Sequence, residues 1–127
     1  MTKFSNQLVL KMHSLLIEMS GGLDGVRDMG LLDSVLQSAF VTFDGVELFP
    51  STVEKAVRIG YGLVSNHAFL DGNKRIGVLF LLVYLEVNGV FISATDSEII
   101  ELGLGLAEGK IKYDELLDWV NAHKSAT

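Results

Sequence analysis

The chain has 127 residues, of which 49% are hydrophobic, and a formal net charge of −6 at pH 7. A chain of this length buries about two thirds of its unfolded surface in a single core, so we expect one domain over residues 1–127. The acidic balance argues against a general role in binding nucleic acid or anionic membranes, because such binding depends on clustered lysine and arginine. The chain has no cysteine, which excludes disulfides and thiolate chemistry.

Neither a secretion signal nor a membrane-spanning run is found. The longest charge-free apolar run, residues 76–85, is far shorter than the about twenty residues that cross a bilayer. We therefore expect a cytoplasmic protein. Apolar residues recur at helical spacing along most of the chain, which predicts an all-α fold of about six helices.

The first two predicted helices flank a pair of glycines. The first helix covers about residues 4–19 and ends at Gly21-Gly22, where left-handed backbone geometry costs little. Asp28 is suited to cap the second helix, which is predicted to run to about Val41. The segment 40–50 breaks the helical pattern, and we interpret it as a loop folded over the core. The positions of the first helix predicted to face the core are Leu8, Met12, Leu15, Leu16 and Met19.

The next two predicted helices enclose the most informative segment. Ser51 and Glu54 form a capping-box pattern at the start of a third helix, which runs to about Asn66. The fourth helix, about residues 73–87, is apolar on nearly every face. A helix of that kind is buried, so we expect it to be the central axis of a compact single-domain bundle.

Two helices are predicted in the last third of the chain. Thr95 and Glu98 form a second capping box, which opens a fifth helix that ends near residue 108. Gly103 and Gly105 each cost this helix about 1 kcal/mol relative to alanine, so their presence indicates close packing against a neighbour. A short last helix covers about residues 114–122.

The segment between the third and fourth helices, residues 67–75, carries the candidate chemistry in the sequence HAFLDGNKR. His67 can accept or give a proton near neutral pH without help from its surroundings. Asp71 offers the hard oxygen ligand that Mg²⁺ takes when it is already bound to substrate phosphates. Residues 72–75 then bring free backbone N–H groups, the positive end of a helix dipole and two cations to one point, which is an anion site.

Each of these residues also has an ordinary structural interpretation. His67 suits a partner of the helix dipole, Asp71 suits an N-cap, and Lys74 with Arg75 suits solvated surface. Taken together these interpretations are weaker, because two adjacent cations are unfavourable at the positive end of a helix dipole. We therefore expect a bound anion.

The same residues resemble the signature of the Fic family, which reads histidine, any residue, phenylalanine, any residue, acid, glycine, asparagine, glycine, arginine. Lys74 stands where most members have the second glycine, and Val78 stands where they have a second arginine. Both departures are similar to the Doc (death-on-curing) branch, the toxins of bacterial and phage toxin–antitoxin modules. Residues 21–34 also resemble the early loop and second helix of Doc-type proteins, so the resemblance covers about the whole chain.

The resemblance implies a Fic-like helical bundle that acts on ATP with Mg²⁺. In the glycine type of Fic protein, AMP is transferred to a protein hydroxyl, whereas the Doc branch binds ATP in the reverse sense and transfers the γ-phosphoryl group. The side chain of Lys74 should obstruct part of the pyrophosphate position of the glycine type. Implied catalytic residues are His67, Asp71, Lys74 and Arg75, with Asp71 as the metal ligand. Implied nucleotide-binding residues are Phe69, Gly72, Asn73, Lys74 and Arg75.

The resemblance also implies partners. The target would be a threonine of elongation factor Tu, and in Fic-like proteins the stretch corresponding to residues 40–50 is a flap that holds the target beside the histidine. No convincing inhibitory motif is present in the chain, so we expect control by a Phd-like antitoxin whose disordered tail folds as a helix into an apolar groove. Three functions stay open: a toxin kinase, an AMP transferase, and a catalytically silent binding module.

Two further histidines lie outside this pattern. His13 lies beside apolar positions of the first predicted helix, and we interpret it as a hydrogen-bonded structural residue. His123 lies near the end of the chain, and we expect it to be solvated.

Overall fold

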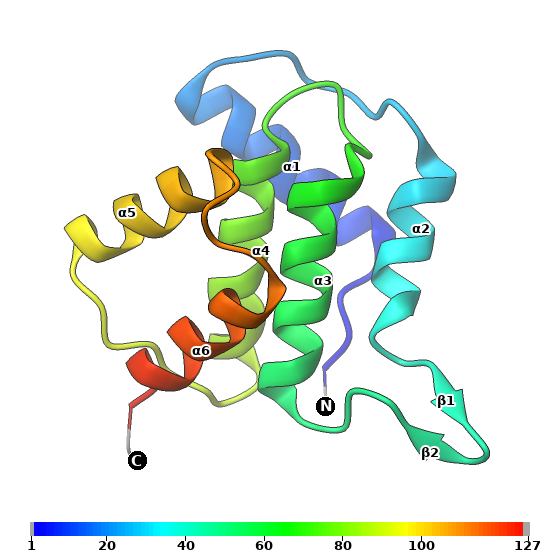
Figure 1. The fold of residues 1–127 in the computed structure, drawn as a ribbon. Helices are drawn as coiled ribbons and strands as arrows, with labels where there is room; N and C mark the ends of the chain where they lie inside the picture. The colour runs from blue at the N-terminus through cyan, green and yellow to red at the C-terminus, as the bar shows by residue number, and fades with distance from the viewer. Residues whose placement is uncertain (1, 126–127) are drawn as a thin grey trace.

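The computed structural model describes residues 2–125, which form six helices and one two-stranded hairpin (Figure 1). The predicted helical fold is confirmed, and the hairpin is the one strand element within the described residues. None of the helices in this range is long and apolar enough to cross a membrane. The elements are α1 (Asn6–Ser20), α2 (Met29–Ser38), β1 (Thr42–Phe43), β2 (Val46–Glu47), α3 (Thr52–Asn66), α4 (Asn73–Val87), α5 (Asp96–Ala107) and α6 (Tyr113–His123).

Helix α4 is the buried axis that the sequence predicts. It lies directly against α3 near the middle of the domain, and the other four helices surround this pair (Figure 1). The two backbones approach closely at Gly60 and Gly77, where a Cβ on Gly77 would lie 2.7 Å from the carbonyl oxygen of Gly60. Phe80 and Tyr84 of α4 are fully buried and stack on each other, with ring centroids 5.3 Å apart. Helix α4, which follows directly on the candidate site loop between α3 and α4, is therefore held rigidly by its packing.

Most helix starts follow the predicted caps. The side chains of Asp28, Ser51 and Thr95 accept hydrogen bonds from the first turns of α2, α3 and α5, and Thr95 forms a complete capping box with Glu98. Helix α2 ends at Ser38 and not near Val41, because the chain turns there to enter the hairpin.

The predicted core face of α1 is only partly confirmed, because of its five positions only Met12 and Leu16 are half-buried and pack against the core. The buried side chains are Val9, His13 and Ile17, whereas Leu8, Leu15 and Met19 are exposed. The spacing i, i+4, i+8 of the buried set is helical, but it includes a histidine, which an apolar pattern does not select. His13 occupies the core because it has a partner there, described below.

Residues 40–50 also differ from expectation. Instead of folding over the core, they form an antiparallel hairpin whose turn is Asp44-Gly45, with both residues at positive φ. That turn geometry suits a two-residue hairpin, and Asp-Gly is its sequence signal. Phe43 and Val46 are 75% and 67% exposed. The hairpin joins the start of α3, and His67 lies at the other end of this 15-residue helix (Figure 1), so the prediction of a flap beside the histidine is also wrong.

The C-terminal part corrects two further predictions. A Cβ on Gly105 would lie 2.5 Å from the Ile111 side chain, as close packing predicts, but a Cβ on Gly103 would meet nothing within 4 Å. His123 is not solvated: its ring stacks on Trp119 at 4.1 Å and its side chain is 20% exposed. Its Nδ1 donates to the Trp119 carbonyl and its Nε2 to the Glu98 carboxylate, each at 2.7 Å.

The two hydrogen bonds of His123 have an electrostatic consequence. Both acceptors require a proton on the ring nitrogen that faces them, which favours the imidazolium. The Trp119 carbonyl first, and the Glu98 carboxylate second, therefore raise the pKa of His123. The ion pair fastens the end of α6 to the first turn of α5.

Candidate active site

The loop that joins α3 to α4, residues 67–72, is called the reactive loop here, and it has a left-handed residue at each end. His67 ends α3 at φ 55°, and Gly72 precedes α4 at φ 74°. A Cβ on Gly72 would lie 3.1 Å from the Ile17 side chain, so the corner combines a glycine conformation with a close approach. Because α4 has no side-chain cap, its first N–H groups stay available to an external acceptor.

A strap, which we define as residues 20–28, fixes this loop from the other side. Leu70 N–H donates to the Gly25 carbonyl at 3.1 Å, and the Ala68 carbonyl accepts from the backbone N–H groups of both Arg27 and Asp28. Val26 and Phe69 form an antiparallel bridge between the two segments. The loop is therefore held by antiparallel pairing with the strap, a second segment of the same chain.

Asp71 lies where the strap, the loop and α4 meet. Its carboxylate accepts from Leu23 N–H at 3.1 Å and from Gly72 N–H at 2.7 Å, and it lies 3.6 Å from the Arg75 guanidinium. The Leu23 bond first, then the Gly72 bond, and more weakly Arg75, lower the pKa of Asp71. The carboxylate is thus kept ionised, as a cation ligand has to be.

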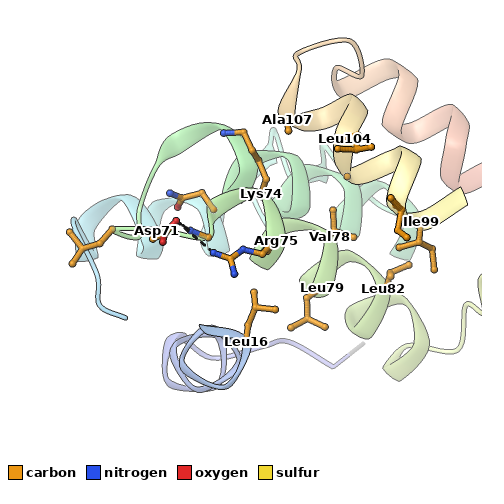
Figure 2. A pocket seen from close by; sticks show the side chains of 15 residues that line it. Leu16, Asp71, Lys74, Arg75, Val78, Leu79, Leu82, Ile99, Leu104 and Ala107 are labelled. Atoms are coloured by element: carbon orange, nitrogen blue, oxygen red, sulfur yellow. Dashed lines mark hydrogen bonds and ion pairs between the residues drawn. The ribbon is translucent and has the colours of Figure 1, made fainter. Parts of the chain in front are cut away.

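The two cations of the loop differ in their surroundings. Arg75 donates to the Ser20 hydroxyl at 2.6 Å and to the Gly21 carbonyl at 2.8 Å, so its guanidinium is fixed beside Asp71 (Figure 2). Lys74 is half-buried at the rim of a cavity, and among residues 2–125 no hydrogen bond or ion pair engages its ammonium. A positioned arginine and an uncommitted lysine suit a ligand with more than one negative group.

Two predicted nucleotide-binding residues hold the loop itself. The Asn73 side chain accepts from Phe69 N–H at 3.0 Å and donates to the Phe69 carbonyl at 3.1 Å. The Phe69 ring is buried and only 1% exposed. Both side chains thus position the loop backbone; Asn73 also lines the cavity, whereas the Phe69 ring does not. The Gly72 N–H is likewise directed to Asp71, which leaves the N–H groups of the first turn of α4 for an anion.

His13 is the structural residue that the sequence predicts. Its ring stacks on Phe69 at 3.9 Å, and its Nε2–H donates to the Asp71 carbonyl at 2.7 Å. Its Nδ1 lies 3.6 Å from the carboxylate of Asp24, which also accepts from the Ser14 hydroxyl. This ring therefore holds the backbone of Asp71, the residue whose carboxylate is the candidate metal ligand.

The charged loop forms one end of a cavity of about 730 Å³. Figure 2 shows Asp71, Lys74 and Arg75 at that end, and apolar side chains of α4 and α5 along the rest. Ile100 and Leu104 on α5 are 61% and 56% exposed. The apolar lining also includes Leu16, Leu70, Val78, Leu79, Leu82 and Ile99. The cavity thus combines an anion end with an apolar groove.

The structure brings most of the predicted site together at the cavity, whereas His67 and the buried Phe69 lie apart from it. Asp71, Gly72, Asn73, Lys74 and Arg75 all line the cavity. His67 is exposed on the loop four residues before Asp71 and does not line the cavity, which suits a base that faces an incoming protein. Sequence reasoning did not assign functional contacts to the strap or to the α5 wall, because their pairing with the loop and α4 involves residues far apart in the chain.

Comparison with known proteins agrees with this geometry. The profile of the Fic/DOC family matches residues 3–85 of the chain. The chain belongs to the Fic/DOC family. A protein named Toxin Doc from Mycolicibacterium smegmatis is 39% identical over 74 residues, or 58% of this chain and 57% of that protein. A protein named Protein kinase doc from Escherichia phage P1 is 28% identical over 121 residues, or 93% of this chain and 92% of that protein.

Membership of the Fic/DOC family gives the anion end a chemical identity, because family members are transferases that use nucleotide substrates. A nucleotide would direct its phosphates to the first turn of α4 and to Lys74 and Arg75. Mg²⁺ held mainly by phosphates needs only one or two protein carboxylates, and the ionised Asp71 at the cavity wall fits that requirement. Within residues 2–125 no three histidine, cysteine, aspartate or glutamate side chains gather as a metal site.

Proposed function

We propose that this chain is the toxin of a toxin–antitoxin module and that it transfers the γ-phosphoryl group of ATP to a serine or threonine hydroxyl of a target protein. The observation that carries the proposal is the uncommitted Lys74 ammonium at the charged end of the cavity. Its side chain occupies the position at which the AMP-transferring Fic pattern has glycine. The names of the two relatives, a toxin and a protein kinase, support the same proposal.

In the proposed reaction each site residue has one task. His67 takes the proton of the target hydroxyl while the hydroxyl oxygen bonds to the γ-phosphorus and the bond to the β-phosphate oxygen breaks, which releases ADP. Lys74, Arg75 and the first-turn N–H groups of α4 stabilise the charge on the transferring group. Mg²⁺ on Asp71 would neutralise charge on the nucleotide phosphates. The protein therefore contributes mainly position and fixed charge, which a loop on a rigid helix can supply.

A second cavity residue supports kinase chemistry over AMP transfer. Val78 lies one helical turn after Lys74 and lines the cavity wall, where the AMP-transferring pattern has a second arginine. The wall thus lacks the cation that would hold a pyrophosphate in that pose. The silent binding module is the weakest alternative, because His67, Asp71, Asn73 and Arg75 are all present.

The discriminating experiment uses ATP labelled at either the α or the γ position. Wild-type protein should pass γ-label and no α-label to a protein target, and His67→Ala should pass neither. Lys74→Gly should lose γ-transfer, because it removes the ammonium that meets the transferring group. Strong α-label with the wild-type protein would replace the kinase by the AMP transferase.

We also propose the partners that a toxin of this kind requires. The target is elongation factor Tu, modified on a threonine in the cytoplasm, and this follows the resemblance to the Doc branch. A Phd-like antitoxin supplies an amphipathic helix that covers the exposed Ile100 and Leu104 of the groove. Expression of the wild-type chain alone should arrest growth of a susceptible bacterium, whereas His67→Ala or co-expressed antitoxin should restore it. Normal growth with abundant wild-type protein would count against the toxin.

A further inference from the structure

We propose that Arg27 is a positioning residue for His67 and that it acts through the carbonyl groups at the end of α3. The proposal rests on the proposed function, in which His67 is the base. The guanidinium Nε–H donates to the His67 carbonyl at 2.7 Å, and Nη2 lies 3.5 Å from the Asn66 carbonyl. Arg27 itself belongs to the strap and is exposed.

The His67 ring has no side-chain support of its own. Its side chain is exposed, and among the described residues no hydrogen bond or ion pair engages the ring. The direction of the ring therefore depends on the backbone that carries it. That backbone is left-handed at φ 55°, a conformation that a residue other than glycine keeps only when its surroundings hold it.

Arg27 supplies that support at the point where the helix stops. The last carbonyl groups of a helix lack partners within the helix, and a cation there also matches the negative end of the dipole. The guanidinium holds the carbonyl of the peptide directly after the His67 Cα, and the N–H of that peptide donates to the Asn66 side chain at 3.2 Å. The carbonyl of the next residue, Ala68, is held by backbone N–H groups of the strap, which do not depend on the Arg27 side chain.

The anion end of the site is fastened by other contacts. His13 holds the Asp71 carbonyl, the Asn73 side chain holds Phe69, and the Leu23 N–H holds the Asp71 carboxylate. None of these contacts involves the Arg27 guanidinium. Its removal should therefore disturb the base and leave nucleotide binding in place.

The test compares full-length Arg27→Met and Arg27→Lys with wild type in γ-phosphoryl transfer to the target. Arg27→Met should lower kcat about tenfold or more and leave KM for ATP within about twofold, because only the base is misplaced. Arg27→Lys should recover part of the loss, since its ammonium can still donate to the His67 carbonyl. The matched control is Arg58→Met, which removes an exposed arginine of α3 whose guanidinium lies over the Phe49 ring, 5.3 Å from its centroid, and it should leave both constants unchanged.

Two outcomes overturn the proposal. The first is a kcat of Arg27→Met within about twofold of that of wild type. The second is a change of both kcat and KM together with a lower melting temperature, because this would mean that the whole loop is disturbed. Backbone and ring NMR signals of His67 provide a readout without catalysis. They should shift in Arg27→Met while those of Lys74 stay. If wild type transfers no phosphoryl group, the proposed function fails, and unchanged His67 signals would then separately overturn the role of Arg27.

Discussion

Gly22→Ala offers a sharp test of how the strap shapes the site. Gly22 has φ 118°, and a Cβ built there would lie 2.5 Å from the Asp71 carboxylate and 3.1 Å from the Arg75 guanidinium. The substitution therefore adds two separable effects. Forcing a side chain at positive φ costs about 1–2 kcal/mol, which lowers the melting temperature of a domain of this size by about 5 °C. Restoring an ordinary contact requires the carboxylate to move by about 1 Å.

The second effect should appear in catalysis. A displacement of about 1 Å in a positioned group can cost about a hundredfold in rate, so we expect γ-phosphoryl transfer by Gly22→Ala to fall by about that factor. Gly89→Ala is the matched control, because Gly89 has φ 85°, follows the far end of α4 and would have no neighbouring atom within 4 Å of an added Cβ. It should lose similar stability and keep its transfer rate. Equal rates for the two variants would refute the argument that the Gly22 backbone makes room for the Asp71 carboxylate.

Two further predictions concern α5. The pKa of His123 is raised and that of Glu98 is lowered in the folded chain, so their pair stabilises the fold fully between about pH 4.5 and 6.5 and loses this effect as the pH rises through the native pKa of His123. Thermal melts of His123→Gln should therefore differ most from wild type near pH 6 and converge at higher pH; a constant difference would exclude this linkage. Leu104→Asp should weaken binding of a Phd-like antitoxin peptide about tenfold or more in calorimetry, because Leu104 is an exposed apolar side chain of the groove. Unchanged affinity would locate the antitoxin elsewhere.

Local signals in the sequence predicted the elements that carry the site. The start of α3 follows from the Ser51 cap, and α4 coincides with the long apolar run in the sequence. The charged residues of the loop were identified from their types and spacing alone. Each of these features depends on residues within one or two helical turns of each other, which is the range that pattern reasoning covers.

The features that were missed depend on distant pairs. The sequence predicted a structural role for His13 but not its burial in α1, because its partner, the Asp71 carbonyl, lies 58 residues away. His123 was expected to be solvated, but it forms a half-buried ion pair with Glu98, which lies 25 residues away in the sequence. The hairpin is different, because its Asp44-Gly45 turn is a local signal. The segment was interpreted as a loop folded over the core because several of its residues are apolar, but in the structure Phe43 and Val46 are exposed.

The most direct test of the central claim is the mass of elongation factor Tu after incubation with the purified chain, ATP and Mg²⁺. The mass should increase by one phosphoryl group on a threonine with the wild-type chain, and His67→Ala should produce no increase. An increase by one AMP group would contradict the role given to Lys74. An unmodified elongation factor, with protein that is folded and binds ATP, would contradict the proposed target.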